Sequence, residues 1–276
     1  MYITSVRLHT EHYPTNRYYP FNVPILRTTS QITFRSPATF FVGDNGSGKS
    51  TLLEAITRKA GVHTWDQPKR HIVHENPYET RLADFIDVAW SDERVAGSLF
   101  RAETFRELAD FLDDVAVCDP GRLQYHGGRM LNTLSHGQGM LTYFRGRFDR
   151  KGLYLLDEPE AALSPKSQVA FLGLLEAFVA AEQAQFIIAT HSPILLSLPG
   201  AQIFSFDGPR VQEVDYEETE HYKVYAQFFA SRQFLAARQG KPDGDVPARG
   251  EGGGGATRAP LTEDLQPELL AVDHLT

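Results

Sequence analysis

The stretch FFVGDNGSGKST, Phe40–Thr51, decides the fold of this chain. Its apolar start predicts a strand. The glycine-rich part that follows fits the pattern G-x-x-x-x-G-K-[ST] at every fixed position and leads into a helix-like run, TLLEAITRKAG. The glycines allow backbone angles that residues with a Cβ avoid, so successive N–H groups can turn inward around phosphate oxygens. The stretch therefore predicts a phosphate-binding loop between a strand and a helix.

Two side chains of this loop define the ligand further. Lys49 would place a positive charge on the β- and γ-phosphates, and the Ser50 hydroxyl would ligate Mg²⁺. The positive end of the helix dipole would face the same anion. The chain contains no N-K-x-D sequence for reading guanine. We therefore expect a nucleoside triphosphate other than GTP, with Mg²⁺, bound by a contiguous set of residues: Gly43, Asp44, Asn45, Gly46, Ser47, Gly48, Lys49, Ser50 and Thr51.

The bulk composition is that of an ordinary globular protein. Its 276 residues are 42% hydrophobic and 22% charged. The formal net charge of −8 argues against a generally basic surface that coats nucleic acid, but it leaves a local basic patch open. No stretch approaches the roughly 20 apolar residues of a membrane span, and the N-terminus lacks the apolar core of a signal peptide. We expect a soluble, cytoplasmic protein with no transmembrane segment of its own.

The second half of the chain supplies candidate catalytic side chains. The apolar run Leu153–Leu156 predicts a buried strand that delivers Asp157 and Glu158 at its carboxyl end. Asp157 would hold Mg²⁺, and Glu158 would polarise the attacking water. A second buried strand, Phe186–Thr190, ends in His191, which could bind a γ-phosphate or the water. These strand ends, together with the phosphate loop, predict a nucleotide-hydrolysing site.

A third motif, LSHGQ at Leu134–Gln138, places a serine and a glycine at the expected start of a helix. A helix N-terminus presents unpaired N–H groups and a positive dipole end to an anion. On its own, this pattern is more typical of a capped helix than of a ligand site.

Other side chains have weaker claims to a function. Arg101 and Glu103 lie at a predicted strand-to-helix junction, where either an ion pair or a role near Mg²⁺ fits, and Gln67 is a candidate contact to Mg²⁺ or water. Tyr18 or Tyr19 could stack on adenine or pack a loop. Cys118, the single cysteine, excludes an internal disulfide and is expected to be partly buried. Three histidines match no standard zinc spacing: His63, His71 and His74.

Further elements are expected from periodicity and punctuation. Apolar residues at helical spacing predict a helix over residues 81–90, with Leu82, Phe85, Ile86 and Ala89 on its core face. The Gly/Pro-rich run after Arg238 predicts a disordered tail whose last residues could form a short helix or docking peptide. Strands are expected over 2–8, 31–36, 97–105 and 201–208, and helices over 104–115, 164–183 and 221–235.

Five segments together, GDNGSGKST, LSHGQ, LYLLDEPE, EAALSP and ATHSP, resemble the ATP-binding cassette (ABC) class of P-loop ATPases. The resemblance covers roughly Tyr2–Leu235 and favours the small standalone ATPases allied to the chromosome-maintenance and recombination-repair branch. It implies an α/β fold with a mixed sheet flanked by helices and a small helical lobe. It further implies that Asp157 and Glu158 form the Walker B pair, that Ala161–Ser164 is the D-loop and that His191 is the switch histidine.

The resemblance also implies how two chains would cooperate. Two copies would sandwich two ATP molecules, so that Ser135, Gly137 and Gln138 of one copy's signature motif contact the nucleotide on the other. Two positions depart from the family pattern. His136 replaces a glycine of the signature, and the Q-loop glutamine is not evident, with Glu103 at the corresponding strand end.

These expectations define a domain plan and a set of functions. Residues 1–237 form the ATPase domain, with the helical lobe at about 104–146, and residues 238–276 form the tail. The chain is expected to be an ATP-hydrolysing switch that dimerises around ATP, in a nucleic-acid repair or defence assembly with a protein partner yet to be identified. The alternatives are the nucleotide-binding subunit of a membrane transporter and an ATP sensor that does not hydrolyse.

Overall fold

The computed structural model describes residues 1–64, 76–91 and 94–238. The chain divides into two units, Met1–Tyr225 and Ala226–Thr276, and each is described by itself. The candidate site residues that the structure describes all belong to the first unit. Gln67, His71, His74 and the tail beyond Arg238 lie outside the described residues.

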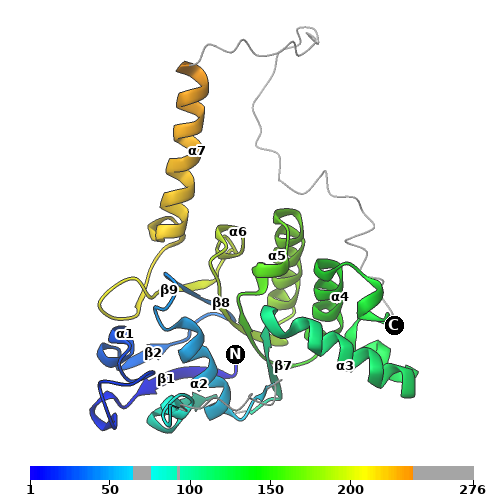
Figure 1. Cartoon of the computed structure of the whole chain (residues 1–276), viewed down its shortest axis with the longest axis horizontal. Helices are drawn as coiled ribbons and strands as arrows, with labels where there is room; N and C mark the ends of the chain where they lie inside the picture. Colours follow the sequence, from blue (N-terminus) through cyan, green and yellow to red (C-terminus); the bar gives the residue numbers. More distant parts are fainter. Residues whose placement is uncertain (65–75, 92–93, 239–276) are drawn as a thin grey trace. The chain divides into compact units, whose positions relative to one another are not determined.

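A mixed sheet of seven strands forms the centre of the first unit, in the order β10-β9-β3-β8-β7-β6-β4 (Figure 1). Neighbours from β9 to β4 run parallel, and β10 pairs antiparallel with β9 at the edge. The strands span β3 Ala38–Val42, β4 His63–Thr64, β6 Gly97–Arg101, β7 Gly152–Asp157, β8 Ala184–Ala189, β9 Gln202–Ser205 and β10 Gln212–Glu213.

A smaller antiparallel sheet lies beside the first, in the order β2-β1-β5. It consists of β1 Ile3–Leu8, β2 Gln31–Thr33 and β5 Ile86–Trp90. The prediction of a helix over residues 81–90 is therefore wrong, because a 3-10 helix at Arg81–Phe85 leads directly into strand β5. The apolar spacing of this segment suits both periods. Antiparallel pairing with β1, in which Val6 lies opposite Val88, favours the strand, although the register shifts between Ile3 and Ser5.

Helix α2, Lys49–Ala60, follows the phosphate loop as predicted and packs between the two sheets. It starts after Gly48 and ends at Gly61, both in the left-handed conformation. Leu52, Leu53 and Ile56 of this helix are fully buried. They join one core cluster with the residues of β3, β7 and β8 that face the small sheet.

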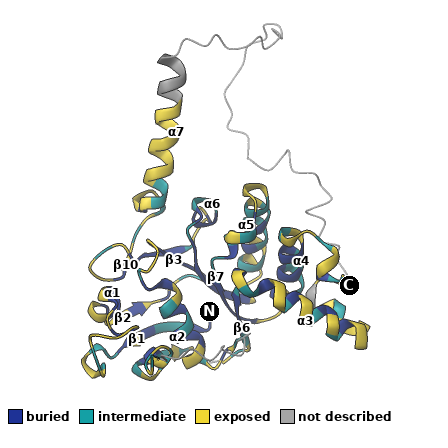
Figure 2. Ribbon diagram, in the orientation of Figure 1, coloured by how far each residue is buried: buried dark blue, intermediate teal, exposed yellow. Residues whose placement is uncertain are grey.

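The opposite face of the central sheet is covered by helices, as Figure 1 shows. They are α3 Phe105–Cys118, α4 His136–Phe148, α5 Pro165–Ala180 and α6 Pro193–Leu196. Alternate strand residues point to this side, so Phe40 belongs to the second core cluster whereas Phe41 belongs to the first. Strands β3, β8 and β9 are fully buried, and β7 is buried up to Leu156, whereas the edge strands β10 and β4 are more exposed (Figure 2). The predicted α/β fold with a mixed, helix-flanked sheet is confirmed.

The remaining elements connect this framework. Cys118 is exposed at the end of α3, so the expectation that it is partly buried is wrong. Its neighbour Val117 is exposed as well, because this end of α3 lies away from the sheet core.

The other helices are α1 Pro24–Thr28, α7 Glu220–Arg238, and 3-10 helices at Thr10–His12, Ala102–Thr104, Pro120–His126, Leu131–Thr133, Pro159–Ala162 and Tyr216–Glu218.

None of the helices in the described ranges is long and apolar enough to cross a membrane. The boundary between the ATPase domain and the tail at residue 237, and the extent of the helical lobe at about 104–146, stay predictions. Helix α7 runs through the first of these positions without interruption.

Candidate nucleotide-binding site

Parallel pairing brings four strand ends to one edge of the central sheet. Phe41 of β3 and Asp157 of β7 both pair with Ala189 of β8, and Arg101 of β6 pairs with Asp157. The segments that follow these strands therefore emerge side by side. They carry the phosphate loop, the Asp157–Glu158 pair and His191, which the sequence predicts to converge.

The phosphate loop is closed around the Lys49 side chain. Lys49 is only 4% exposed, and its Nζ donates to the Gly43 carbonyl at 2.6 Å and to the Asp44 carbonyl at 2.9 Å. Burial is the main cause that lowers the pKa of Lys49, while the surrounding carboxylates, Glu158 first, act in the opposite direction. A bound anion would add to those carboxylates and favour the charged ammonium.

Asp207 supports the loop from the end of β9, and sequence reasoning missed it. Its Oδ1 accepts the Asp44 N–H at 2.8 Å. At Gly43, where φ is +150°, a Cβ would lie 2.9 Å from this oxygen, so only glycine fits beneath it. Ser47 carries a buried hydroxyl with no hydrogen-bond partner among the described residues, an orphaned polar group within the loop that a phosphate oxygen would satisfy.

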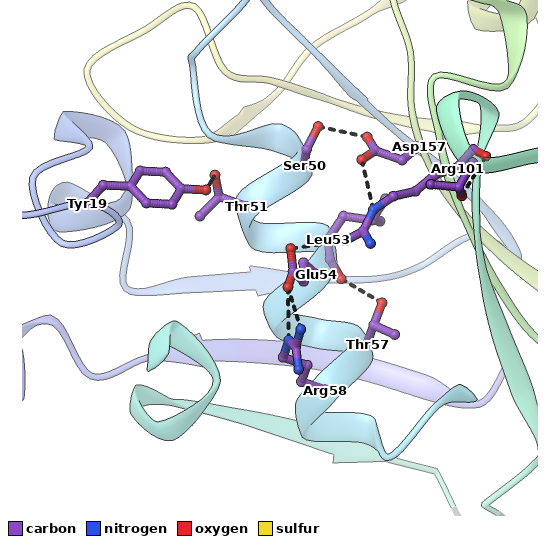
Figure 3. A network of polar contacts seen from close by, with 10 residues as sticks. Tyr19, Ser50, Thr51, Leu53, Glu54, Thr57, Arg58, Arg101 and Asp157 are labelled. Atoms are coloured by element: carbon purple, nitrogen blue, oxygen red, sulfur yellow. Dashed lines mark hydrogen bonds and ion pairs between the residues drawn. The ribbon is translucent and has the colours of Figure 1, made fainter. Parts of the chain in front are cut away.

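Ser50 and Asp157 form the candidate Mg²⁺ site (Figure 3). The Ser50 hydroxyl donates to Asp157 Oδ1 at 2.7 Å. Burial raises the pKa of Asp157 to about 6, and the hydrogen bond from Ser50 and the charge of Arg101 oppose this shift. A hydroxyl and a carboxylate at this distance fit Mg²⁺, which prefers oxygen ligands and uses few of them from the protein.

Arg101 connects Asp157 to helix α2. Its Nε lies 3.9 Å from Asp157 Oδ2, and its terminal nitrogen lies 3.0 Å from Glu54 Oε2. Glu54 in turn pairs with Arg58 at 2.8 Å, and Figure 3 shows the whole network. Arg101 thus takes part in ion pairs, and because one partner is the candidate Mg²⁺ ligand Asp157, a role of Arg101 near Mg²⁺ stays a prediction. Glu103 lies close enough to contribute to raising the pKa of Asp157, and its assignment to the Q-loop stays a prediction.

Tyr19 touches the far end of the phosphate-loop motif. Its hydroxyl lies 2.9 Å from Thr51 Oγ1 (Figure 3), and the residue is 41% exposed. Tyr18 is more exposed and lies against Tyr78. Stacking of either ring on adenine stays a prediction.

Glu158 and His191 face each other across the end of β7. Glu158 has φ +49° and ψ +51°, a left-handed conformation that is strained for a residue with a Cβ. Its backbone N–H donates to the Ala189 carbonyl at 2.9 Å, and its Oε1 lies 3.7 Å from His191 Nε2. His191 Nε2 is buried and has no hydrogen-bond partner among the described residues. The pKa of His191 is lowered, mainly by burial and next by the charge of Lys49.

Two residues that sequence reasoning missed hold His191. Glu160 Oε1 accepts the backbone N–H of His191 at 2.6 Å, and His221 Nε2 lies 3.1 Å from its ring Nδ1. Glu160 belongs to the DEPE run and could have been noticed as a third carboxylate. His221 follows 30 residues after His191 in a different helix, and no motif marks it.

The described contacts of the predicted signature motif do not include the phosphate loop of the same chain. Ser135 caps α4 in a capping box with Gln138, whose Oε1 accepts the Ser135 N–H at 3.3 Å. A Cβ on Gly137 would meet the Ala162 carbonyl at 3.4 Å, which places this turn beside the predicted D-loop. Ser135 is exposed.

Of the three histidines considered for a metal site, only His63 lies among the described residues. His63, in β4, is exposed. Within the ranges that the structure describes, no group of three or more His, Cys, Asp or Glu residues is arranged to hold a metal ion.

Two family models match segments of this chain that carry the site. The model described as "AAA domain, putative AbiEii toxin, Type IV TA system" matches residues 141–197, and the model described as "AAA domain" matches residues 21–59. The second match ends within α2, and the first covers β7, Asp157, Glu158 and His191. The chain contains an AAA/ABC-type P-loop ATPase domain.

Relatives of this ATPase domain include two import proteins. The cobalt import ATP-binding protein CbiO of Salmonella typhimurium is 28% identical over 191 residues, which cover 62% of this chain and 67% of that protein. The thiamine import ATP-binding protein ThiQ of Haemophilus influenzae is 27% identical over 162 residues, covering 55% of this chain and 74% of that protein. The alliance with the chromosome-maintenance branch stays a prediction.

Solved structures of other proteins resemble this chain in fold. CbiO1 of Clostridium perfringens, part of the ABC transporter complex cbiONQ, aligns with a TM-score of 0.46 at 17% identity, covering 75% of this chain and 88% of that one. A nucleotide-free ATP-binding cassette from an ABC transporter aligns with a TM-score of 0.47 at 14% identity, covering 82% and 96%.

Proposed function

We propose that this chain hydrolyses ATP to ADP and phosphate with Mg²⁺ and uses the reaction as a conformational switch. The observation that supports this function most directly is the convergence of Lys49, the Ser50–Asp157 pair and the Glu158–His191 pair at one edge of the sheet. Each of these groups suits a different part of a triphosphate and its attacking water.

The side chains divide the chemistry by position. Mg²⁺, when bound by Ser50 and Asp157, would neutralise charge on the β- and γ-phosphates. Lys49 would exchange its two carbonyl partners for phosphate oxygens. Glu158 is the group placed to orient and deprotonate water, because its carboxylate is half exposed at the end of β7. His191 Nε2, which has no hydrogen-bond partner among the described residues, would donate to the γ-phosphate.

The same site supports an ATP-dependent dimer. Ser135 is exposed at a helix N-terminus, and the described hydrogen bonds of its motif are local. Such a group is available to the γ-phosphate of a second copy, where the N–H groups of α4 would meet the anion. Ser135, Gly137 and Gln138 are therefore proposed to act on the partner's nucleotide.

A phosphate-release assay tests the proposed function. We expect steady release from the wild-type chain with ATP and Mg²⁺, and loss of release in Glu158→Gln, which keeps the shape of the side chain but cannot accept the proton. ATP binding by Glu158→Gln should persist. If the wild-type chain binds ATP but releases no phosphate, the chain is an ATP sensor instead.

Import is the second candidate process. The names of CbiO and ThiQ favour it, since both are import ATP-binding proteins. Neither name refers to nucleic acid, and the formal net charge of this chain is −8. A role in nucleic-acid repair therefore has less support. The toxin named in the family description favours a defence process. Co-purification of an integral membrane protein with the native chain would decide for import.

A further inference from the structure

His221 lies against the ring of His191. It stands in the first turn of α7, and its Nε2 is 3.1 Å from His191 Nδ1. The two ring centroids are 5.2 Å apart, with the ring planes inclined by 49°. This contact uses one nitrogen of each ring. The other nitrogens, His191 Nε2 and His221 Nδ1, are buried without hydrogen-bond partners among the described residues.

This contact restricts the proton positions on His191. A neutral imidazole carries one N–H, so one ring must donate and the other must accept. If His191 Nδ1 donates, its Nε2 is bare and would repel an anion. If His221 Nε2 donates, His191 Nδ1 accepts and the proton stays on His191 Nε2. Only the second arrangement can bind an oxygen of a phosphate at Nε2.

The first turn of α7 is held at the right place for this role. The Thr219 hydroxyl accepts the Tyr222 N–H at 3.2 Å and donates to the Tyr216 carbonyl at 2.7 Å, which fixes the start of the helix. The Tyr216 hydroxyl donates to the Pro193 carbonyl at 2.9 Å. The segment that carries His221 is thus bonded a second time to the segment that carries His191.

We propose that His221 is a positioning residue whose Nε2–H donates to His191 Nδ1 and thereby keeps a proton on His191 Nε2 for the terminal phosphate of ATP. The part of this proposal that concerns hydrolysis rests on the proposed ATPase function. The hydrogen bond between His221 and His191 does not depend on that function. It also links the start of α7 to the terminal phosphate through one ring, which gives the helix a direct connection to the state of the nucleotide.

Steady-state kinetics test the role in hydrolysis. We expect His221→Phe, which keeps a ring but has no N–H, to lower kcat about tenfold, the effect of one lost hydrogen bond in the transition state, with little change in KM for ATP. His221→Gln offers an N–H at a similar reach and should recover most of kcat. Lys223→Ala, at an exposed ion pair on the same helix, is the matched control and should match the wild type.

A double-mutant cycle separates positioning from packing. In a His191→Ala background, His221→Phe should have no further effect on kcat, because the group that it positions is gone. Equal loss of kcat in His221→Phe and His221→Gln, or full additivity with His191→Ala, would overturn the proposal.

Nitrogen NMR tests the contact without any turnover. Burial lowers the pKa of both rings, so both are neutral at pH 8. At that pH the nucleotide-free wild type should show His191 protonated on Nε2 alone, and His221→Phe should show both tautomers. The same tautomer pattern in both proteins would overturn the proposal. A chain that releases no phosphate but shows the expected tautomers would contradict only the proposed function.

Discussion

The Ser50 hydroxyl donates a 2.7 Å hydrogen bond to Asp157 Oδ1, and the two residues are 107 positions apart. The bond joins the start of α2 to the end of β7, across the place where Mg²⁺ would enter. Asp157 is only 13% exposed, and Arg101 Nε lies 3.9 Å from its Oδ2. The carboxylate is therefore held ready for a divalent ion at a cost to the nucleotide-free fold.

Replacement of Asp157 by Asn should stabilise the nucleotide-free protein at neutral pH. Burial raises the pKa of Asp157 from 3.8 to about 6, so the folded state binds the proton more tightly than the unfolded state does. The wild type therefore loses stability as the pH rises from about 4 to 6. Asp157→Asn escapes this loss, and its advantage in unfolding free energy should grow over that range to on the order of 1–3 kcal/mol.

Urea unfolding between pH 4.5 and 8, without Mg²⁺ or nucleotide, measures this difference. Ser50→Ala is the informative comparison, because it removes the hydrogen bond that favours the ionised carboxylate and should therefore lower stability above pH 6. A constant difference between Asp157→Asn and the wild type at every pH would contradict the titration of this group.

Replacement of Lys49 by Met should abolish most of the affinity for ATP. The ammonium is buried and donates its hydrogen bonds to uncharged backbone carbonyls, which a bound phosphate would replace with charged oxygens. Loss of a hydrogen bond to a charged group costs about 1.5–3 kcal/mol, which corresponds to about a 10- to 100-fold rise in Kd. Isothermal titration with a non-hydrolysable ATP analogue measures it.

Lys59→Met is the matched control for this prediction. Lys59 belongs to the same helix, but it is more exposed and pairs with Asp87 at 3.4 Å. Its replacement should leave Kd unchanged. An unchanged Kd in Lys49→Met would remove the phosphate-loop assignment.

The parts of the site that were predictable share one property. The loop at Gly43–Ser50, the Asp157–Glu158 pair and His191 each follow an apolar strand within a local pattern, and parallel strands place such ends at a common edge. His221 and Asp207 were not predictable in this way, because each acts through a single contact with a segment distant in sequence. The strand Ile86–Trp90 was mispredicted for a related reason, since only its ladder with β1 distinguishes it from a helix.

Replacement of Ser135 by Asp should prevent the proposed ATP-dependent dimer without unfolding α4. Aspartate is as good an N-cap as serine, so the helix start is retained. Its carboxylate would face the partner's γ-phosphate and repel it. In a Glu158→Gln background that retains ATP, we expect Glu158→Gln alone to elute as a dimer and the Ser135→Asp double variant to elute as a monomer.

Ser135→Asn in the same background is the control for this prediction. Asparagine caps a helix equally well but carries no charge, so the dimer should persist. Size-exclusion chromatography with light scattering reads both results. A dimer of equal stability in Ser135→Asp and Ser135→Asn would show that this residue does not meet the partner's nucleotide.

The left-handed backbone of Glu158 should reverse the usual order of glycine and alanine. An L-residue with a Cβ loses roughly 1–2 kcal/mol in this conformation, whereas glycine adopts it freely and loses about 0.4–1 kcal/mol through the greater freedom of its unfolded chain. Glu158→Gly should therefore be more stable than Glu158→Ala by about 0.5–1 kcal/mol, although both variants lose hydrolysis.

Two other positions serve as controls. Glu182, with φ +56°, should show the same order of glycine and alanine while keeping full activity. Glu176 is exposed within α5, and there alanine should be the more stable by a similar amount. Urea unfolding of the three pairs measures these differences. If Glu158 follows the order of Glu176, the strained conformation at the end of β7 is not what the protein adopts in solution.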